Sequence, residues 1–414
     1  MALSFGFALK TVLSSSNPLE PETVDIAGAL GRVLACPVTA IRDDPYFDRS
    51  AMDGYALRSG DIDADGSNLN VVCSIFAGDP LPQFELVKGE AARIMTGAPV
   101  PNGADAVQIV ENTISKPGSK TVQILRPVSP GANIRKRGEI ARVDDVIVEA
   151  GSVVDEERSA VIVSAGYTHV NVFRRPSVRV LATGDELVEP GVPLASGQLY
   201  ESNRTLIAAL CKQAGAIVSV GNIVPDDPRA LAEAIEASID FDVLVLSGGV
   251  SVGDKDMVAG VLENQGVTIQ FHGVSIQPGK PLLFGKRGQG IVFGLPGNPV
   301  SAAVTAKLFL VPALLRLQGI EDPLPPVLRM PVRASLHPGG QRLFLAPAAV
   351  ECVNGHFEVA KISTQGSADA VHHARRNAFL VRPANAPAAN SGDGVSVIMD
   401  SLRTGGNIAD YLDF

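Results

Sequence analysis

The stretch 242–256 reads DVLVLSGGVSVGDKD and constrains the fold of this chain more than any other segment. It begins with a short apolar run, rich in β-branched residues, which predicts a strand buried on both faces of a parallel sheet. Ser247, Gly248 and Gly249 end that strand, and a helical pattern resumes at Met257. In α/β proteins a strand, a glycine turn and a helix start bring backbone N–H groups close to an anionic ligand.

Two acidic residues, Asp254 and Asp256, make this turn unusual. Two carboxylates repel a bare phosphate, but they suit a divalent cation that lies between carboxylate and phosphate. In the alternative interpretation the segment is an ordinary turn between strand and helix, and Asp256 caps the helix. The stretch by itself leaves both interpretations open.

Composition limits the class of protein. The chain has 414 residues, enough for two to four domains, and its hydrophobic content of 46% is typical of a globular protein. Its net charge of −9 argues against a general nucleic-acid binder, which would carry a basic face. Aromatic residues are few and Trp is absent, which argues against a platform for stacking bases. We therefore expect no nucleic-acid partner.

Cysteine usage and hydropathy predict the compartment. The four cysteines are widely scattered and show no spacing typical of a zinc site or a redox pair. The first ten residues lack the basic and apolar regions of a secretory signal. No stretch reaches the roughly 18 unbroken apolar residues of a membrane span. We expect a soluble, cytoplasmic protein without a membrane partner.

Changes in the hydropathy pattern predict two domains in the first part of the chain. Short helical patterns, including 24–34 and 155–165, assign residues 1–42 and 139–173 to one discontinuous helical linker domain. Short alternating runs and many turn residues assign 43–138 to a β-rich domain. The β-rich domain is thus expected as an insertion between the two parts of the helical one.

The second half of the chain holds two further predicted domains. Residues 174–322 alternate between apolar strands and helical patterns, which predicts a parallel sheet with helices on both faces. A proline-rich linker, PLPP, starts at Pro323, and the short strands after it predict a small β-barrel or sandwich over 323–414. The expected fold class is multidomain α/β with a central parallel α/β domain.

Three loops of the central domain are candidates for a ligand site, because ligands of parallel sheets bind beyond the carboxyl ends of the strands. They are TGDEL at 183–187, the glycine turn of the 242–256 stretch, and LPGNPVS at 295–301. Each combines a glycine with a polar side chain near a turn or helix start. Together they predict a pocket that suits a magnesium-bound phosphate or pyrophosphate. The alternative for each loop is ordinary turn chemistry with helix capping.

Three further residues are weaker candidates when taken singly. Lys280, in QPGKP, either neutralises phosphate or oxyanion charge or is a solvated loop lysine. Asp53 and Thr96 lie beside glycines in the β-rich segment, where turn formation is the favoured explanation of each motif taken alone. The histidines show no metal spacing and no serine or cysteine has an evident base, so covalent catalysis is not indicated.

Seven motifs, in order along the chain, resemble the molybdopterin molybdenumtransferase family, also called the MoeA family, which includes the E domain of gephyrin. The likeness covers essentially the whole chain. The motifs are SAMDGYAL at 50–57, MTGAPVPNGADAV at 95–107, TGDEL at 183–187, the 242–256 stretch, PGKP at 278–281, LPGNPVS at 295–301 and TQGSADAVHHARRNAF at 364–379.

The resemblance implies a fold and an activity. It implies four domains in an elongated homodimer, with a MoaB/MogA-like, molybdopterin-binding α/β domain. It implies insertion of molybdenum from molybdate into adenylylated molybdopterin, with release of AMP and a requirement for Mg²⁺. A molybdopterin adenylyltransferase is a candidate partner. An adenylate phosphoanhydride needs its charge offset by a cation, and the acidic loops can hold one.

The resemblance also assigns roles to residues of this chain. Because the family's active site is built across the dimer, Asp53 and Thr96 are expected from the other subunit. The catalytic candidates are Asp53, Thr96, Glu186, Asp226 and Asp256. The metal-binding candidates are Asp226, Asp254 and Asp256. The ligand-binding candidates are Ser247, Gly248, Gly249, Lys280, Pro296, Gly297, Asn298, Pro299 and Ser301.

Four positions depart from the family pattern. Gln277 and Gly273 stand where the family has basic residues, and Ala346 stands where an arginine is common. Ile140 replaces an acidic residue of a Gly-Glu-Asp motif. Since the ligand is polyanionic, the loss of three bases predicts weaker binding unless other bases replace them. Candidates for that replacement are Lys255, Lys280, Arg287 and Arg375.

These departures motivate a rival hypothesis. In that hypothesis the chain is a divergent paralogue that binds molybdopterin or a partner protein without efficient metal insertion. The retained acids and the LPGNPVS loop favour the enzyme instead. The two hypotheses differ in whether AMP is released from adenylylated molybdopterin.

Overall fold

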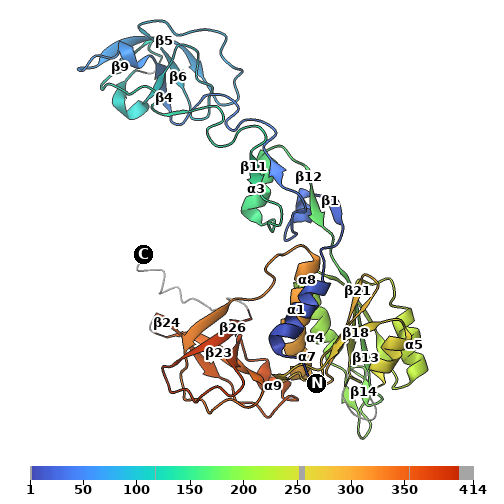
Figure 1. Cartoon of the computed structure of the whole chain (residues 1–414). Coiled ribbons are helices and arrows are strands. Elements are labelled where there is room, and N and C mark those ends of the chain that lie inside the picture. Colours follow the sequence, from blue (N-terminus) through green and yellow to red (C-terminus); the bar gives the residue numbers. More distant parts are fainter. Residues whose placement is uncertain (1, 117, 251–256, 354, 401–414) are drawn as a thin grey trace.

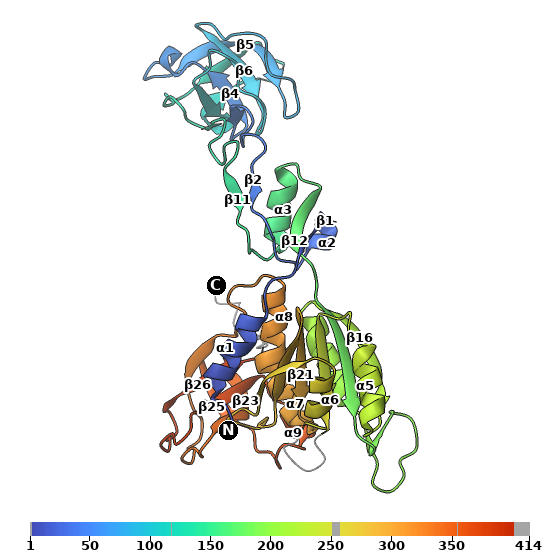
Figure 2. The ribbon, with the colours of Figure 1, turned by 45° about the vertical axis from the view of Figure 1, so that its right-hand side comes forward.

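The structure is a computed structural model that describes residues 2–116, 118–250, 257–353 and 355–400. It is elongated, with a β-rich unit at one end, a small connecting unit next to it, and two larger units side by side at the other end (Figures 1 and 2). The larger pair consists of a central α/β unit and a C-terminal β unit, and the N-terminal helix lies against them. Their shared boundary positions the site described below.

The β-rich unit is one six-stranded sheet with the order β7-β4-β6-β5-β9-β8. Buried apolar residues form a separate cluster on each face of this sheet. Two short alternating runs of the sequence, 71–75 and 121–124, thus lie within strands, as their period of two predicts. The strands are β4 (Gly54–Leu57), β5 (Ser67–Ile75), β6 (Glu90–Ile94), β7 (Ala106–Ile109), β8 (Thr113–Ile114) and β9 (Thr121–Ile124).

The connecting unit is made of two chain segments that pass each other in opposite directions. β1 pairs antiparallel with β12, and β2 pairs antiparallel with β11. The helical pattern expected at 24–34 is wrong for its start, because Val24 lies in β1 and only one helical turn follows. The elements are β1 (Pro21–Asp25), α2 (Ile26–Ala29), β2 (Val38–Thr39), β11 (Val146–Val148), α3 (Glu156–Ser164) and β12 (His169–Phe173).

The first helix, α1 (Phe5–Ser15), packs on the central unit. Its buried residues Ala8, Leu9 and Val12 share a core with Phe309 and Leu314 of the central unit. The sequence interpretation grouped this helix with the connecting unit, because its periodicity shows an apolar face but not the surface that covers that face. The structure instead packs α1 on the central unit. The other predicted domain boundaries stay predictions.

The central sheet has the order β16-β13-β17-β21-β20-β18. The first four strands run parallel, as expected, whereas β20 and β18 run antiparallel. The expectation of an all-parallel sheet is therefore wrong at this edge, because the link from β20 to β21 is too short for a crossover. The strands are β13 (Ser177–Thr183), β16 (Ile217–Val224), β17 (Val243–Ser247), β18 (Thr268–His272), β20 (Leu283–Arg287) and β21 (Gly290–Leu295).

Helices cover both faces of this sheet. All five residues of β17 are buried; Val243 and Val245 join the core on one face, and Leu244 and Leu246 join the core on the other. The helices are α4 (Asn203–Gln213), α5 (Pro228–Glu236), α6 (Val258–Asn264), α7 (Pro299–Thr305) and α8 (Val311–Leu317). The first face carries the N-terminal helix α1, α4 and the helical run from α7 to α8, and the second face carries α5 and α6.

A π-helical turn, η3 (Ala306–Leu310), joins α7 to α8 into one helical run. Among the described residues, this run is the helix long and apolar enough to cross a membrane. Within its most apolar window 78% of the residues are buried inside the protein, as in the core helix of a globular fold.

The C-terminal unit is built on a third six-stranded sheet, which includes β19 (Ile276–Gln277) from the central unit. β19 pairs parallel with β23, so one ladder joins the two units. Leu345, Phe379 and Ile398 extend into the core of the central unit. The other elements are β22 (Val327–Pro331), β23 (Leu343–Val353), β24 (His356–Lys361), α9 (Ala370–His373), β25 (Ala378–Arg382) and β26 (Gly394–Met399).

Candidate functional site

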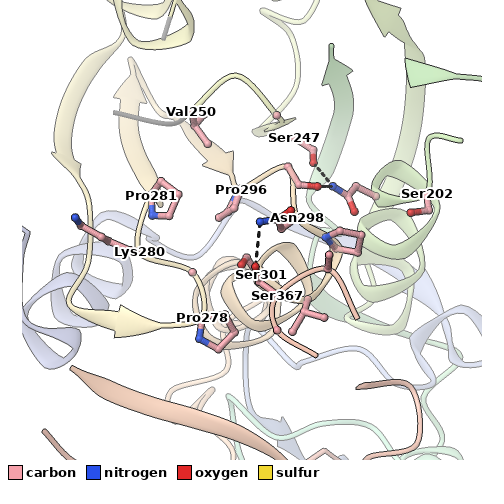
Figure 3. Close-up of a pocket in the computed structure, with 18 of the residues that line it drawn as sticks. Ser202, Ser247, Val250, Pro278, Lys280, Pro281, Pro296, Asn298, Ser301 and Ser367 are labelled. Atoms are coloured by element: carbon pink, nitrogen blue, oxygen red, sulfur yellow. Dashed lines mark hydrogen bonds between the residues drawn. The ribbon is translucent and has the colours of Figure 1, made fainter. Parts of the chain in front are cut away.

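A cavity of about 1190 Å³ lies between the central and C-terminal units (Figure 3). The loops that follow β13, β17 and β21 form one wall, as the rule for parallel sheets predicts. The 277–281 turn and residues of the C-terminal unit form the other wall. The cavity therefore combines the three loops selected from the sequence with a surface that belongs to another sheet.

The turn after β17 requires glycine, because the backbone of a neighbouring strand lies very close to it. Gly248 has φ 93°, and a Cβ atom there would lie 2.4 Å from the Thr183 carbonyl oxygen. The Gly248 N–H donates to the Leu295 carbonyl oxygen at 3.1 Å. The turn thus links the ends of three neighbouring strands, and any side chain at this position would separate them.

Asn203, the first residue of α4, connects two of the cavity loops. Its Nδ2 donates to Ser247 Oγ at 2.9 Å and to the Gly297 carbonyl oxygen at 2.7 Å. Its Oδ1 is buried and has no hydrogen-bond partner among the described residues. The sequence analysis did not select Asn203, because nothing near it in the sequence indicates these partners.

Asn298 attaches the LPGNPVS loop to the C-terminal unit. Its Nδ2 donates to Ser367 Oγ at 3.0 Å, and the Val300 N–H donates to the Ser367 carbonyl oxygen at 3.2 Å. Figure 3 shows Asn298 and Ser301 facing the cavity beside Ser367. Pro299 then begins the helical run from α7 to α8. Proline is favoured at the first position of a helix, because the N–H that it lacks would have no partner within the helix.

Acidic side chains line the side of the cavity that belongs to the central unit. Asp226 accepts a hydrogen bond from Thr183 Oγ1 at 2.8 Å, and the Asp226 N–H donates to Asp185 Oδ1 at 3.0 Å. Glu186, on the same loop as Thr183, also lines the cavity. No group of three or more His, Cys, Asp or Glu side chains placed to hold a metal occurs among the described residues. Asp254 and Asp256 lie outside the described residues.

A third acid of the cavity wall, Glu201, has a structural partner. Glu201 Oε2 is 2.8 Å from Arg204 Nε, and both side chains are buried. Arg204 also contacts Glu189 at 2.7 Å. Burial works to lower the pKa of Arg204, but hydrogen bonds to Glu201 and Glu189 outweigh it and raise that pKa above its ordinary value. Glu201 is therefore neutralised inside the protein, which leaves Asp226 and Glu186 as the acids available to a ligand.

Basic side chains line the other side of the cavity. Lys280 and Ser202 lie on opposite sides in Figure 3. Two further cations, Arg342 and Lys361, come from the C-terminal unit. In the described part of the chain, none of the three cations forms a salt bridge with a carboxylate. The sequence analysis identified Lys280 but missed the other two, which follow no motif.

The four departures from the family pattern have different structural contexts. Gln277 is exposed and its backbone pairs with Phe344. Gly273 has φ 107°, a conformation that a larger residue adopts only with strain. Ala346 is fully buried in the core of the C-terminal unit, and Ile140 is 64% exposed near the connecting unit. None of the last three lines the cavity in the described structure.

Of the four bases that the sequence suggested as replacements, Lys280 is the one that lines the cavity in the described structure. Arg287 pairs with Glu236 at 2.9 Å, and Arg375 does not line the cavity. Lys255 lies outside the described residues. The prediction that Arg287 or Arg375 replaces the lost bases of this cavity therefore finds no support in its lining.

Asp53 and Thr96 lie together in the β-rich unit. Asp53 Oδ1 accepts hydrogen bonds from the Thr96 backbone N–H at 2.7 Å and from Thr96 Oγ1 at 2.8 Å. These two bonds, the backbone one first, hold the pKa of Asp53 below its ordinary value. Neither residue lines the cavity of its own chain. The predicted residues that the fold does bring to the cavity are Glu186, Asp226, Ser247, Gly248, Gly249, Lys280, Pro296, Gly297, Asn298, Pro299 and Ser301.

Together, the fold and the cavity define a class: multidomain α/β proteins whose ligand site lies beyond the strand ends of one domain and against a second domain. Residues 3–166 match the family described as MoeA N-terminal region (domain I and II), and residues 179–316 match the family described as probable molybdopterin binding domain.

Relatives cover nearly the whole chain. The molybdopterin molybdenumtransferase of Nostoc sp. is 36% identical over 389 residues, 92% of this chain and 88% of the relative. That of Haemophilus influenzae is 35% identical over 384 residues, 92% of this chain and 94% of the relative. A solved structure, the molybdopterin biosynthesis moeA protein from Pyrococcus horikoshii, superposes with a TM-score of 0.83 at 30% identity, over 97% of this chain and all of that one.

The chain belongs to the molybdopterin molybdenumtransferase family. The resemblance inferred from the seven motifs is thereby confirmed, and so is the multidomain α/β fold class.

Proposed function

We propose that the protein is a transferase of molybdenum cofactor biosynthesis that inserts molybdenum from molybdate into adenylylated molybdopterin and releases AMP. The observation that carries this proposal is the large cavity, which is lined by carboxylates and by cations that form no salt bridge among the described residues. A polyanionic substrate and an oxyanion co-substrate need both kinds of group. The rival hypothesis of a binding-only paralogue is not favoured, since the relatives cited above are named as transferases.

The acidic side of the cavity fits Mg²⁺. Magnesium in phosphate sites is bound by one or two carboxylates together with substrate phosphate oxygens and water. Asp226 and Glu186 would supply these carboxylates, and Asp254 and Asp256 stay further predicted ligands. When bound, the ion offsets the charge of the phosphoanhydride.

The chain's own residues bind and orient the substrate. The glycine turn at Gly248 and Gly249 permits close approach of the substrate to the backbone. Asn203 fixes the Ser247 and Gly297 loops relative to each other, so their groups meet the ligand in one geometry. Lys280 stabilises negative charge on the opposite side.

The proposal includes a homodimer whose site is shared between subunits. Asp53 and Thr96 lie in the β-rich unit, at the opposite end of the chain from the cavity (Figures 1 and 2). In a dimer these two residues would complete the partner's cavity. A molybdopterin adenylyltransferase as supplier of the substrate, and a cytoplasmic location, belong to the same proposal; the four cysteines, all free thiols, support that location.

The test is a direct assay of AMP release. Purified protein receives adenylylated molybdopterin, Mg²⁺ and molybdate, and AMP is measured by chromatography. We expect release from the wild type, a loss of about 100-fold or more for Asp226→Asn, and unchanged release for Glu233→Gln, an exposed acid on α5. The transferase proposal is rejected if the substrate binds but no AMP is released.

A further inference from the structure

Two cations of the C-terminal unit, Arg342 and Lys361, line the cavity at positions that the family pattern does not explain. Gln277, Gly273 and Ala346 stand at the positions where the resemblance to the family leads us to expect bases. Gly273 has φ 107° and Ala346 is enclosed in an apolar core, so neither position presents a side chain to the cavity. The cavity nevertheless has a basic side. Its charge must therefore come from other positions.

Arg342 lies at the seam between the two units. Its Nη1 donates to the Ile276 carbonyl oxygen at 3.3 Å, and Ile276 directly precedes Gln277 on β19. The next residue, Leu343, pairs with Ile276 in the β19–β23 ladder. A guanidinium has five N–H donors in a planar fork, and this contact uses one. Arg342 makes no other side-chain hydrogen bond in the described structure, and it lines the cavity close in the sheet to Gln277.

Lys361 reaches the same seam from β24. It pairs with Ala348 of β23, at the end of the β23–β24 ladder. Its Nζ lies 5.4 Å from the centre of the Phe344 ring, and Phe344 itself pairs with Gln277. The aromatic ring restrains the lysine without neutralising it, because the ring supplies no formal charge. Lys361 is thus a cation held in place, without a carboxylate partner in the described structure, beside the same short strand.

The distribution of charge in the cavity indicates which kind of ligand Arg342 and Lys361 bind. Arg342 and Lys361 line the same cavity as Lys280 and have no carboxylate partner among the described residues. Two such cations suit an anion of two charges, and a guanidinium fork suits tetrahedral oxygens. The acids of the cavity, Asp226 and Glu186, come from the central unit. A dianion is therefore stabilised on the C-terminal side and repelled from the acidic side unless a metal intervenes.

We infer that Arg342 and Lys361 bind a tetrahedral oxyanion dianion in the cavity, in place of the bases absent at Gln277, Gly273 and Ala346. The inference rests on the proposed function for the identity of that anion, which is either the molybdate substrate or the phosphate of the AMP product. The binding itself needs no turnover. Arg342 and Lys361 are specificity-determining residues for the oxyanion, and the C-terminal unit is part of the site.

The experiment measures equilibrium binding of two probes, inorganic molybdate and AMP, by calorimetry with the full chain. Variants are Lys361→Gln, Arg342→Gln, the double variant, and Lys361→Arg as the charge-conserving rescue. Lys212→Gln, an exposed lysine in the last turn of α4, is the matched control. Circular dichroism verifies the fold of each variant.

We expect each single neutral variant to weaken binding of one probe by about tenfold, and the double variant by more, with Lys361→Arg near wild type. A shift confined to molybdate assigns the site to the free oxyanion, and a shift confined to AMP assigns it to the adenylate phosphate. Unchanged affinity for both probes in the folded double variant overturns the inference. Because these readouts involve no AMP release, a protein inactive as a transferase could still satisfy them.

Discussion

Asp53 Oδ1 accepts both hydrogen bonds that Thr96 donates, from its N–H at 2.7 Å and from its Oγ1 at 2.8 Å. Both bonds go to a single carboxylate oxygen. Oδ2 accepts no hydrogen bond in the described part of the chain. The pair lies in the β-rich unit, and the other polar candidates lie in the cavity at the opposite end of the molecule. Asp53 thus presents one oxygen to a surface that its own cavity does not reach.

Mixed dimers test the shared site. Asp53→Asn and Asp226→Asn should each abolish AMP release, since each removes one half of the composite site. After subunit exchange of equal amounts, half of the dimers are mixed and each mixed dimer has one intact site. Activity should therefore return to about a quarter of wild type. Either variant exchanged with itself is the control, and a mixture that stays inactive after verified exchange rejects the shared site.

The buried ion pair of the cavity wall should contribute strongly to stability. Glu201→Gln leaves Arg204 buried with less compensation, which costs roughly 3–5 kcal/mol. The control is Glu189→Gln, because Glu189 contacts the same arginine from an exposed position and should cost under about 1 kcal/mol. Urea unfolding measures both. Equal effects would show that burial does not determine the strength of this contact.

Gly248 should tolerate no side chain. Alanine there would place Cβ 2.4 Å from the Thr183 carbonyl oxygen and adopt φ 93°. We expect a loss of about 1–3 kcal/mol and weaker ligand binding, because the turn must shift. Gly260 in α6 is the matched control, since a Cβ atom there meets nothing within 4 Å. Gly260→Ala should be neutral or stabilising by about 0.5–1 kcal/mol.

His373 should make the C-terminal unit sensitive to acid. Burial, and then the positive charge of Arg376, lowers the pKa of His373 from 6.5 to about 4. The unfolded chain therefore takes up the proton first as the pH falls. The stability present above pH 6.5 is lost progressively down to pH 4, by an amount on the order of 2–3 kcal/mol.

His373→Gln should flatten this pH dependence, because glutamine does not titrate and its Oε1 can still accept from Arg376 Nε, as His373 Nε2 does at 3.1 Å. Thermal unfolding at pH 7 and pH 4.5, followed by circular dichroism, measures the difference. His356→Gln, an exposed residue of the same unit, should keep the wild-type dependence. An unchanged slope in His373→Gln would assign the acid sensitivity to other groups.

Much of the cavity wall that belongs to the central unit could be predicted from local sequence. The apolar run 243–246 predicted a strand buried on both faces, and the two cores on either side of β17 confirm it. The glycines after it predicted a close turn, and Gly248 has the positive φ that such a turn requires. These features depend on residues next to one another in the chain, where periodicity and turn chemistry act directly.

The basic wall could not be predicted in this way. Arg342 and Lys361 enter the cavity because β19 of the central unit pairs with β23 of the C-terminal unit, across more than 60 residues. Asn203 meets Ser247 and Gly297 for a similar reason. No motif marks such residues, since their function arises from the surface against which their strand or helix packs.

By itself, the sequence determined the family, the α/β class and the three loops that end the central strands. Only the tertiary structure decided that α1 packs on the central unit, that β20 and β18 run antiparallel, and that the C-terminal unit supplies cations to the cavity. Local patterns fix which residues form a strand, a turn or an amphipathic face. The partner of each face is chosen by packing and hydrogen bonding across the whole chain, and that choice assembled the site.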